Sequence, residues 1–212
     1  EIQDSVFSGC SLLSDIQISS GNNNFVFENG KLYNEEKDNL IFITKSSIDE
    51  NTTEITIEEG IKKISPYVLN FYTNATVLNL PSTFQSISYH IIPENIKEIN
   101  ISEGNLKYSS DGVNVYDDST STLVVSVTKE KSTTVRNGTK IIGNFAFARS
   151  TNLESVTLNN DLEKINSQAF FSTKLKNVYI PASVTYIDPI AFYMLDLESF
   201  LIDPANKNYI SD

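Results

Sequence analysis

Few residues of this sequence have side chains that could do catalytic chemistry. The chain of 212 residues contains one histidine, His90, and one cysteine, Cys10. Cys10 lies in a predicted tight turn with no neighbouring cation in sequence to activate it, so we expect a small half-buried thiol. His90, in "ISYHII", is expected to be a surface residue, on the convex side of a repeat structure. Without a nucleophile–base pair, the sequence predicts a protein that is not an enzyme.

Carboxylates near glycine are the other candidate for site chemistry. Asp111, Asp117 and Asp118 flank a turn in "SSDGVNVYDD". Spaced carboxylates of this kind can hold Ca²⁺, but the spacing differs from that of an EF-hand loop. Because Asp-Gly is also a common turn signal, we predict no catalytic residue, no metal and no cofactor. Ca²⁺ at the hairpin turns is the one alternative that the sequence leaves open.

The charge of the chain restricts its partners. The formal net charge is −11, whereas phosphate binding needs clustered Lys and Arg, so nucleic acid is not an expected partner. An anionic membrane surface is disfavoured for the same reason. Direct membrane insertion is not expected either, since no apolar run approaches the length of a membrane helix.

The elements that would position any site come from a repeated phrase. An isoleucine is followed four and five residues later by two apolar residues, most clearly Ala-Phe in "LEKINSQAFFSTKLKNVYIPASVTYIDPIAF" (162–192). The copies are Ile2/Val6/Phe7, Ile64/Val68/Leu69, Ile87/Ile91/Ile92, Ile142/Ala146/Phe147, Ile165/Ala169/Phe170 and Ile187/Ala191/Phe192. One coil offers too few apolar side chains to close a core, so we predict that stacked coils bury one another.

Each copy is followed by a short alternating segment that predicts a strand. Neighbouring uninterrupted segments are about 21 to 23 residues apart, within the leucine-rich range. Pro81 and Pro181 directly follow a segment, and because proline has no N–H to donate, we expect strands to end there. The segments are Ile16-x-Ile18, Leu78-x-Leu80, Ile99-x-Ile101, Val156-x-Leu158, Val178-x-Ile180 and Phe200-x-Ile202, while Ile55-x-Ile57 and Thr133-x-Val135 precede a copy.

Two longer connections, at about 19–54 and 102–132, interrupt the repeat. Each contains Asn-Gly or Asp-Gly, then a tyrosine (Tyr33 or Tyr116), then an apolar run that ends in Thr. Glycine supplies the positive φ that a tight hairpin turn needs. We therefore predict two inserted β-hairpins that protrude from the coils.

The two ends of the chain both lie inside a repeat. The chain begins with Glu1 rather than Met, partway through a coil. A third connection begins at 203–212, where Asn206, Tyr209 and Asp212 repeat the spacing of Asn105, Tyr108 and Asp111. We therefore expect residues 1–212 to be one solenoid domain from a longer protein.

With these phrases in view, the sequence resembles the BspA-type leucine-rich repeats of bacterial surface proteins, which also occur in some protozoa. "EIQDSVFSGCSLLSDIQI" (1–18), "GTKIIGNFAFARSTNLESVTL" (138–158) and "LKNVYIPASVTYIDPIAF" (175–192) carry the resemblance, which covers nearly the whole chain. The middle departs from the pattern, because Val68-Leu69 and Ile91-Ile92 replace Ala-Phe, so we expect those coils to pack differently. The resemblance implies an extracellular or cell-surface module that binds proteins or other cells.

Candidate ligand-binding residues follow from the strand geometry. The residue between the two apolar positions of each strand points away from the core, so aligned strands form a column with a spacing of about 4.8 Å. Ordinary strand propensity also explains Thr and Tyr at such positions. An exposed Tyr beside an exposed Leu, however, is typical of interface anchors. The candidates are Tyr179, Leu201, Thr157, Asn79 and Asn100.

Taken together, the sequence predicts an α/β solenoid. We expect a right-handed leucine-rich repeat coil with short parallel strands, short helices or turns on the opposite face, and the inserted hairpins. The expected role is non-enzymatic recognition of a protein or glycan ligand, in adhesion to a host or neighbouring cell surface. The alternative is a structural spacer that holds a separate functional domain away from the cell surface.

Overall fold

The structure is a computed structural model that describes residues 2–209. It contains two compact units, Glu1–Leu106 and Lys107–Asp212. Within the described residues there is no α-helix; three short 3₁₀ helices occur instead. None of the helices in this range has the length and apolar character needed to cross a membrane. Asp212, which was expected to match Asp111, lies outside the described residues.

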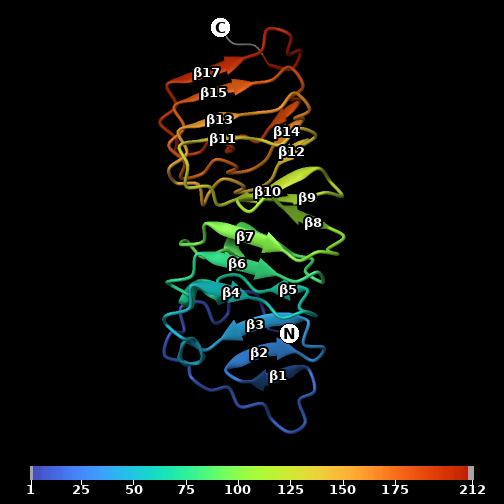
Figure 1. Ribbon diagram of the computed structural model, residues 1–212, viewed down its shortest axis with the longest axis vertical. Helices are drawn as coiled ribbons and strands as arrows, with labels where there is room; N and C mark the ends of the chain where they lie inside the picture. The colour runs from blue at the N-terminus through green and yellow to red at the C-terminus, as the bar shows by residue number, and fades with distance from the viewer. Residues whose placement is uncertain (1, 210–212) are drawn as a thin grey trace. The chain divides into compact units, whose positions relative to one another are not determined.

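In the N-terminal unit, strands form two sheets (Figure 1). One sheet, in the order β4-β6-β7, is parallel and contains the predicted segments of the coils. The other sheet has the order β1-β2-β3-β5. The elements are β1 (Phe25–Glu28), β2 (Lys31–Asn34), β3 (Asn39–Ile43), β4 (Glu54–Thr56), β5 (Lys63–Ile64), β6 (Val77–Leu80) and β7 (Glu98–Ile101), with η1 (Lys45–Ser47), η2 (Val68–Phe71) and η3 (Tyr89–Ile91).

The C-terminal unit has the same design. Two parallel pairs, β11–β13 and β15–β17, hold the predicted alternating segments. A six-stranded sheet has the order β16-β14-β12-β10-β9-β8. The elements are β8 (Tyr108–Ser110), β9 (Asn114–Asp117), β10 (Thr122–Ser126), β11 (Ser132–Thr134), β12 (Ile141–Ile142), β13 (Ser155–Thr157), β14 (Lys164–Ile165), β15 (Asn177–Ile180), β16 (Tyr186–Ile187) and β17 (Ser199–Ile202).

The predicted strands are confirmed with one exception. Seven of the eight alternating segments overlap strands, and β6 and β15 end directly before Pro81 and Pro181. The exception is Ile16-x-Ile18, which forms no strand. Its two isoleucines instead pack, half-buried, against a cluster around Phe42. The first copy therefore contributes apolar side chains to the core but no strand to the parallel sheet.

Of the short helices or turns expected opposite these strands, the structure has mainly turns, and the fold is a β-solenoid in which helices are nearly absent. The isoleucine that opens a copy lies in a two-residue strand in β5, β12, β14 and β16, and the last three of these pair in parallel. Ala-Phe then follows in a tight turn. The preceding residue has a left-handed backbone, with φ of 55° at Phe145 and 51° at Gln168. Tyr67, which precedes Val68-Leu69, is left-handed as well, with φ of 66°, but there a short 3₁₀ helix follows.

Backbone hydrogen bonds at these turns run between coils. The N–H of Phe145 donates to the carbonyl of Ser167 at 3.1 Å, and the N–H of Phe147 donates to that of Ala169 at 2.8 Å. The N–H of Gln168 similarly donates to Ile190. The Ala-Phe turn, which forms the corner of each coil, thus continues the backbone hydrogen bonding between neighbouring coils. Few of its buried backbone groups are left to form a helix.

Stacked phenylalanines fill the core of the C-terminal unit. Phe170 has no exposed surface, and its ring stacks on those of Phe147 and Phe192 with centroids 5.1 Å apart on each side. Interplanar angles of 6° and 5° show that the rings are nearly parallel. Their spacing follows the separation of neighbouring strands, which confirms that Ala-Phe repeats from coil to coil as part of one core.

The copies that lack Ala-Phe pack differently, as expected. Val68 and Leu69 lie in the 3₁₀ helix η2, and Ile91 ends the 3₁₀ helix η3. By contrast, Ala146-Phe147 and Ala169-Phe170 lie in turns. Val68, Leu69 and Ile91 are nevertheless buried, so the substituted residues keep the role of Ala-Phe in the core.

Both predicted hairpins form, but they do not protrude. β1 and β2 pair antiparallel across Asn29-Gly30, and β8 and β9 pair antiparallel across Asp111-Gly112. The strand that follows each hairpin, β3 or β10, pairs antiparallel with it on one side. On its other side it pairs in parallel with β5 or β12. Each hairpin therefore extends a sheet, because the strand after it, β3 or β10, offers the hairpin a free edge with unpaired backbone groups.

Candidate functional site

The predicted outward column exists within each unit. In the N-terminal unit, Thr56, Asn79 and Asn100 are register partners on β4, β6 and β7. In the C-terminal unit, Thr157 is the partner of Thr134, and Tyr179 is the partner of Leu201. The structure thus places the five candidate residues in three separate groups: Asn79 with Asn100, Thr157 with Thr134, and Tyr179 with Leu201.

Tyr179 and Leu201 form an exposed apolar pair. They are 48% and 55% exposed, on the adjacent strands β15 and β17. The hydroxyl of Tyr179 donates a hydrogen bond of 2.7 Å to a carboxylate oxygen of Asp203. This bond raises the pKa of Tyr179 and lowers that of Asp203. The bond holds the tyrosine ring in place, so less side-chain entropy would be lost if a ligand packed on it.

The column of the N-terminal unit is polar and bonded to itself. The Asn79 amide donates to the Thr56 hydroxyl at 3.2 Å, and the Asn100 amide donates to the Asn79 carbonyl at 3.0 Å. The Asn79 amide also contacts Glu54, and the Asn100 amide donates to Glu98. These bonds satisfy the amides within the protein, so Asn79 and Asn100 are not placed as free hydrogen-bonding groups.

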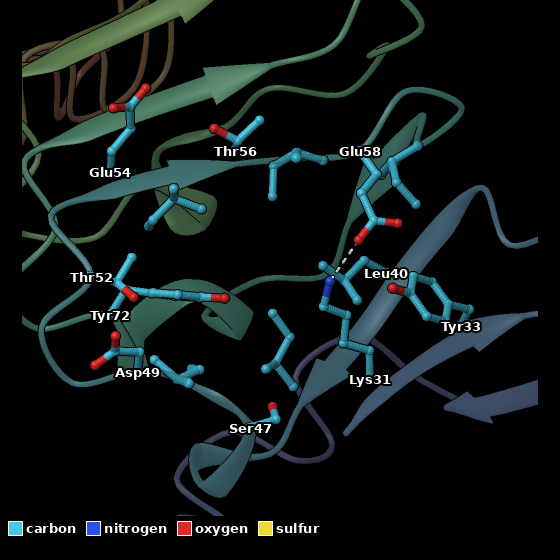
Figure 2. A pocket seen from close by; sticks show the side chains of 15 residues that line it. Lys31, Tyr33, Leu40, Ser47, Asp49, Thr52, Glu54, Thr56, Glu58 and Tyr72 are labelled. Carbon is cyan, nitrogen blue, oxygen red and sulfur yellow. Dashed lines mark hydrogen bonds and ion pairs between the residues drawn. The ribbon is translucent and has the colours of Figure 1, made fainter. Parts of the chain in front are cut away.

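A cavity of about 250 Å³ lies in the N-terminal unit (Figure 2). Lys31 and Tyr33 of β2 line one wall, β4 lines another, and Tyr72 approaches from the end of η2. Lys31 Nζ donates to Glu58 Oε1 at 2.8 Å. The sequence pattern does not reveal this cavity, because Tyr33 is recognisable there only as a hairpin residue. The fold brings Tyr33 and β4, which are distant in sequence, to the same cavity.

The two tyrosines of the cavity have neutral hydroxyl groups. Figure 2 shows Tyr33 and Tyr72 extending from opposite sides with their hydroxyls directed toward Lys31. Burial is the largest influence on both and raises the pKa of Tyr33 and of Tyr72. For Lys31, burial lowers the pKa, but the hydrogen bond to Glu58 and the charges of nearby acidic groups outweigh it, so its pKa is raised. At neutral pH the cavity thus contains two phenols and the Lys31–Glu58 ion pair, and Asp49 and Glu54 also belong to its lining.

The acidic turn residues have structural partners. Asp111 accepts hydrogen bonds from the backbone N–H groups of Val113 and Asn114, and Asp117 accepts from Ser119 and Thr120. Asp118 pairs with Arg136 at 2.7 Å. Among residues 2–209, no three His, Cys, Asp or Glu side chains gather where they could hold a metal ion. The turn role predicted from Asp-Gly is confirmed.

The remaining candidate side chains lie in packed surroundings. Cys10 is a free thiol in a turn and is half-buried, as predicted. His90 is half-buried as well, and its ring packs edge-on between Tyr67 and Tyr89 with centroids 5.5 and 5.2 Å away. The expected surface position of His90 was therefore only partly right, because the rings flanking the 3₁₀ turn cover the imidazole.

Solved structures of bacterial leucine-rich repeat proteins resemble this chain. A leucine-rich repeat protein of Eubacterium ventriosum superposes with a TM-score of 0.56 at 18% identity, covering 70% of this chain and 41% of that protein. The pneumococcal vaccine antigen PcpA gives a TM-score of 0.52 at 19% identity, covering 73% and 52%. A leucine-rich cell surface protein of Faecalibacterium prausnitzii gives 0.51 at 19%, covering 90% and 58%.

These similarities concern the fold. The chain spans about half the length of the three solved proteins. The search of curated proteins found no match. The sequence pattern of the BspA type leucine rich repeat region matches six copies, over residues 1–120 and 125–212. Since these ranges include nearly all of the chain, the protein belongs to the BspA-type leucine-rich repeat family.

Proposed function

We propose that this chain is a non-enzymatic recognition module of a cell-surface protein, in which the C-terminal unit binds a macromolecular ligand through the outward face of β13, β15 and β17. The exposed, in-register pair of Tyr179 and Leu201 carries the proposal. An aromatic and an aliphatic side chain side by side on a rigid sheet are typical of interface anchors. Thr157, on β13, extends the same outward position with a polar side chain.

Cell-surface placement is part of the proposal and rests on similarity. The solved protein of F. prausnitzii is described as a leucine-rich cell surface protein, and it shares this fold over 90% of the chain. A role in adhesion to a host or neighbouring cell follows from that placement together with the exposed face.

A spacer role is the second candidate, and the N-terminal unit favours it. The outward positions Thr56, Asn79 and Asn100 are polar and bonded to one another. A face of this kind resists association, because a partner would have to replace bonds that are already made. The two candidates therefore predict different behaviour for the two units.

The test is binding to an array of purified extracellular proteins and glycans. We expect the wild-type chain to bind at least one of them, and Tyr179→Ala to weaken that binding by about tenfold or more. Tyr186→Ala is the matched control, since Tyr186 is 44% exposed but lies on β16 in the other sheet. If no component of the array binds, the result supports the spacer role. If both variants weaken binding equally, the ligand does not bind at the face that contains Tyr179 and Leu201.

A further inference from the structure

The cavity of the N-terminal unit lies beside an open strand edge. β4 is the end strand of its sheet and pairs only with β6 among the described residues. The N–H of Ile57 donates to Asn79 in β6, and backbone groups alternate in direction along a strand. The backbone groups of Glu54 and Thr56 therefore face the other edge, where the cavity lies (Figure 2). An open edge offers both donors and acceptors to a ligand.

The centre of the cavity contains charges of both signs. Lys31 and Glu58 form an ion pair, with side chains that are 29% and 68% exposed. An anionic ligand would meet the Glu58 carboxylate, and a cationic ligand would meet the Lys31 ammonium, so either would be repelled by one partner. The carboxylate of Glu54 points away toward β6, where it contacts the Asn79 amide (Figure 2). Asp49 also lines the cavity, and its carboxylate accepts hydrogen bonds from the backbone and side chain of Asn51. Because the carboxylates of Glu54 and Asp49 are both bonded elsewhere, the central Lys31–Glu58 pair favours a ligand without net charge.

The uncharged groups of the cavity suit hydroxyl groups. The phenols of Tyr33 and Tyr72 can each donate and accept a hydrogen bond, Lys31 donates and Glu58 accepts. Ile55 and Ile57 add an apolar surface within the same cavity, and both are buried. A pyranose ring combines hydroxyl groups at its edge with C–H groups on its faces, which matches this lining. The volume of about 250 Å³ is below that of pockets for drug-sized ligands, so it fits a single ring.

We propose that this cavity binds one neutral sugar ring, as a terminal unit of a glycan, between Tyr33, Tyr72 and the Lys31–Glu58 pair. The site lies in the N-terminal unit and does not depend on the face that includes Tyr179. It gives that unit a binding activity of its own, in addition to the polar face that favours a spacer.

The experiment is a ¹H–¹⁵N NMR titration of the whole chain with D-glucose, D-galactose, D-mannose and N-acetyl-D-glucosamine, each up to about 50 mM. At least one sugar is expected to give saturable shifts at amides of β2 and β4. Tyr72→Phe removes only a hydroxyl and is expected to weaken binding about fivefold. Tyr193→Ala, at an exposed side chain of the C-terminal unit, is the control and leaves sugar binding unchanged.

Charged analogues test the ion pair. D-glucuronate and D-glucosamine are expected to bind the wild type more weakly than the neutral sugars. Glu58→Gln removes the carboxylate charge and leaves Lys31 unneutralised, so glucuronate should gain affinity relative to the neutral sugars. The proposal is overturned if none of the four neutral sugars shifts these amides, if a charged analogue binds the wild type more tightly, or if Tyr72→Phe and Tyr193→Ala act alike.

Discussion

At the scale of single residues, the corner of each coil combines a buried aromatic ring with an unfavourable backbone angle. Phe170 is fully buried between two other phenylalanine rings. Two residues earlier, Gln168 has a φ of 51°, which side chains other than glycine adopt with difficulty. The stacking of Phe170 and the inter-coil hydrogen bond of Gln168 compensate for that angle.

Truncation of the stacked ring should destabilise the C-terminal unit strongly. Phe170→Ala removes a buried ring and leaves a cavity, and we expect a loss of about 3 to 5 kcal/mol in the free energy of unfolding, measured by chemical denaturation. Tyr193→Ala, at a side chain that is 51% exposed, should change it by less than about 0.5 kcal/mol. Similar losses from both variants would show that Phe170 is not in the core.

A glycine at the corner should stabilise the same unit. Gln168→Gly relieves the left-handed strain of about 1 to 2 kcal/mol, which exceeds the entropy that a glycine loses on folding. We expect a net gain of about 0.5 kcal/mol in the free energy of unfolding. Asn166→Gly, two residues earlier and without a positive φ, should instead destabilise. A lower free energy of unfolding for Gln168→Gly than for the wild type would show that the left-handed backbone at Gln168 is not strained.

At the scale of elements, asparagines bind each coil to the turn of the preceding one. The amide of Asn159 donates to the carbonyls of Arg136 and Thr139 at 2.8 and 3.1 Å. Asn105 and Asn206 each donate to two carbonyls in the same way, at Pro81 and Phe84 and at Pro181 and Val184. Asn105 and Asn206 occupy the same position in their repeats, three residues before a tyrosine, and the shared position therefore reflects a shared structural role.

Loss of this amide should leave two carbonyls without a donor. Asn159 is 6% exposed, so Asn159→Ala is expected to lower the free energy of unfolding by about 1 to 3 kcal/mol. Asn160→Ala, at the exposed neighbouring position, is the control and should change it by less than about 0.5 kcal/mol. Thermal and chemical unfolding of the two variants provide the measurement, and equal effects would argue against the bonds.

At the scale of the whole molecule, the charged side chains set a pH range for stability. A hydrogen bond from Asn34 and then one from Lys62 lower the pKa of Asp38 below 3.8, and hydrogen bonds from Ser82 and Thr83 lower that of Glu59 below 4.5. A hydrogen bond to Glu163 raises the pKa of Lys140 above 10.5. Each shift means that the folded state favours the charged form.

The signs of these shifts predict loss of stability at both extremes of pH. A lowered carboxyl pKa contributes stability above its unfolded value and loses it as the pH falls through the folded value, so the loss begins below about pH 4.5. A raised lysine pKa contributes stability below about 10.5 and loses it as the pH rises further. Calorimetric unfolding midpoints between about pH 3 and pH 11 should fall at both ends, and a midpoint that increases below pH 4 would contradict the bonds.

The repeat was readable from the sequence because its signals are local and periodic. The spacing of Ile165, Ala169 and Phe170 recurs at Ile187, Ala191 and Phe192, and both sets stack as expected. The second row of strands was missed, because Lys164–Ile165 is too short for a period-2 pattern to appear. The left-handed turn at Gln168 was missed too, because no glycine marks it.

The exposed pair was predictable for the same reason, whereas the cavity was not. Tyr179 and Leu201 are 22 residues apart in the same position of successive copies, so their alignment follows from the repeat. The cavity brings Lys31, Glu58 and Tyr72 together through the path of the first hairpin. Such contacts depend on tertiary packing, which a one-dimensional pattern does not contain.

In each unit, the coils are successive layers of one stack, and the fold and both proposed sites follow from that arrangement. The direct measurement is a set of nuclear Overhauser contacts in solution. We expect ring contacts of Phe170 with both Phe147 and Phe192, together with the parallel-strand pattern between Val178 and Phe200. An antiparallel pattern between β15 and β17, or a Phe170 ring in contact with water alone, would contradict it.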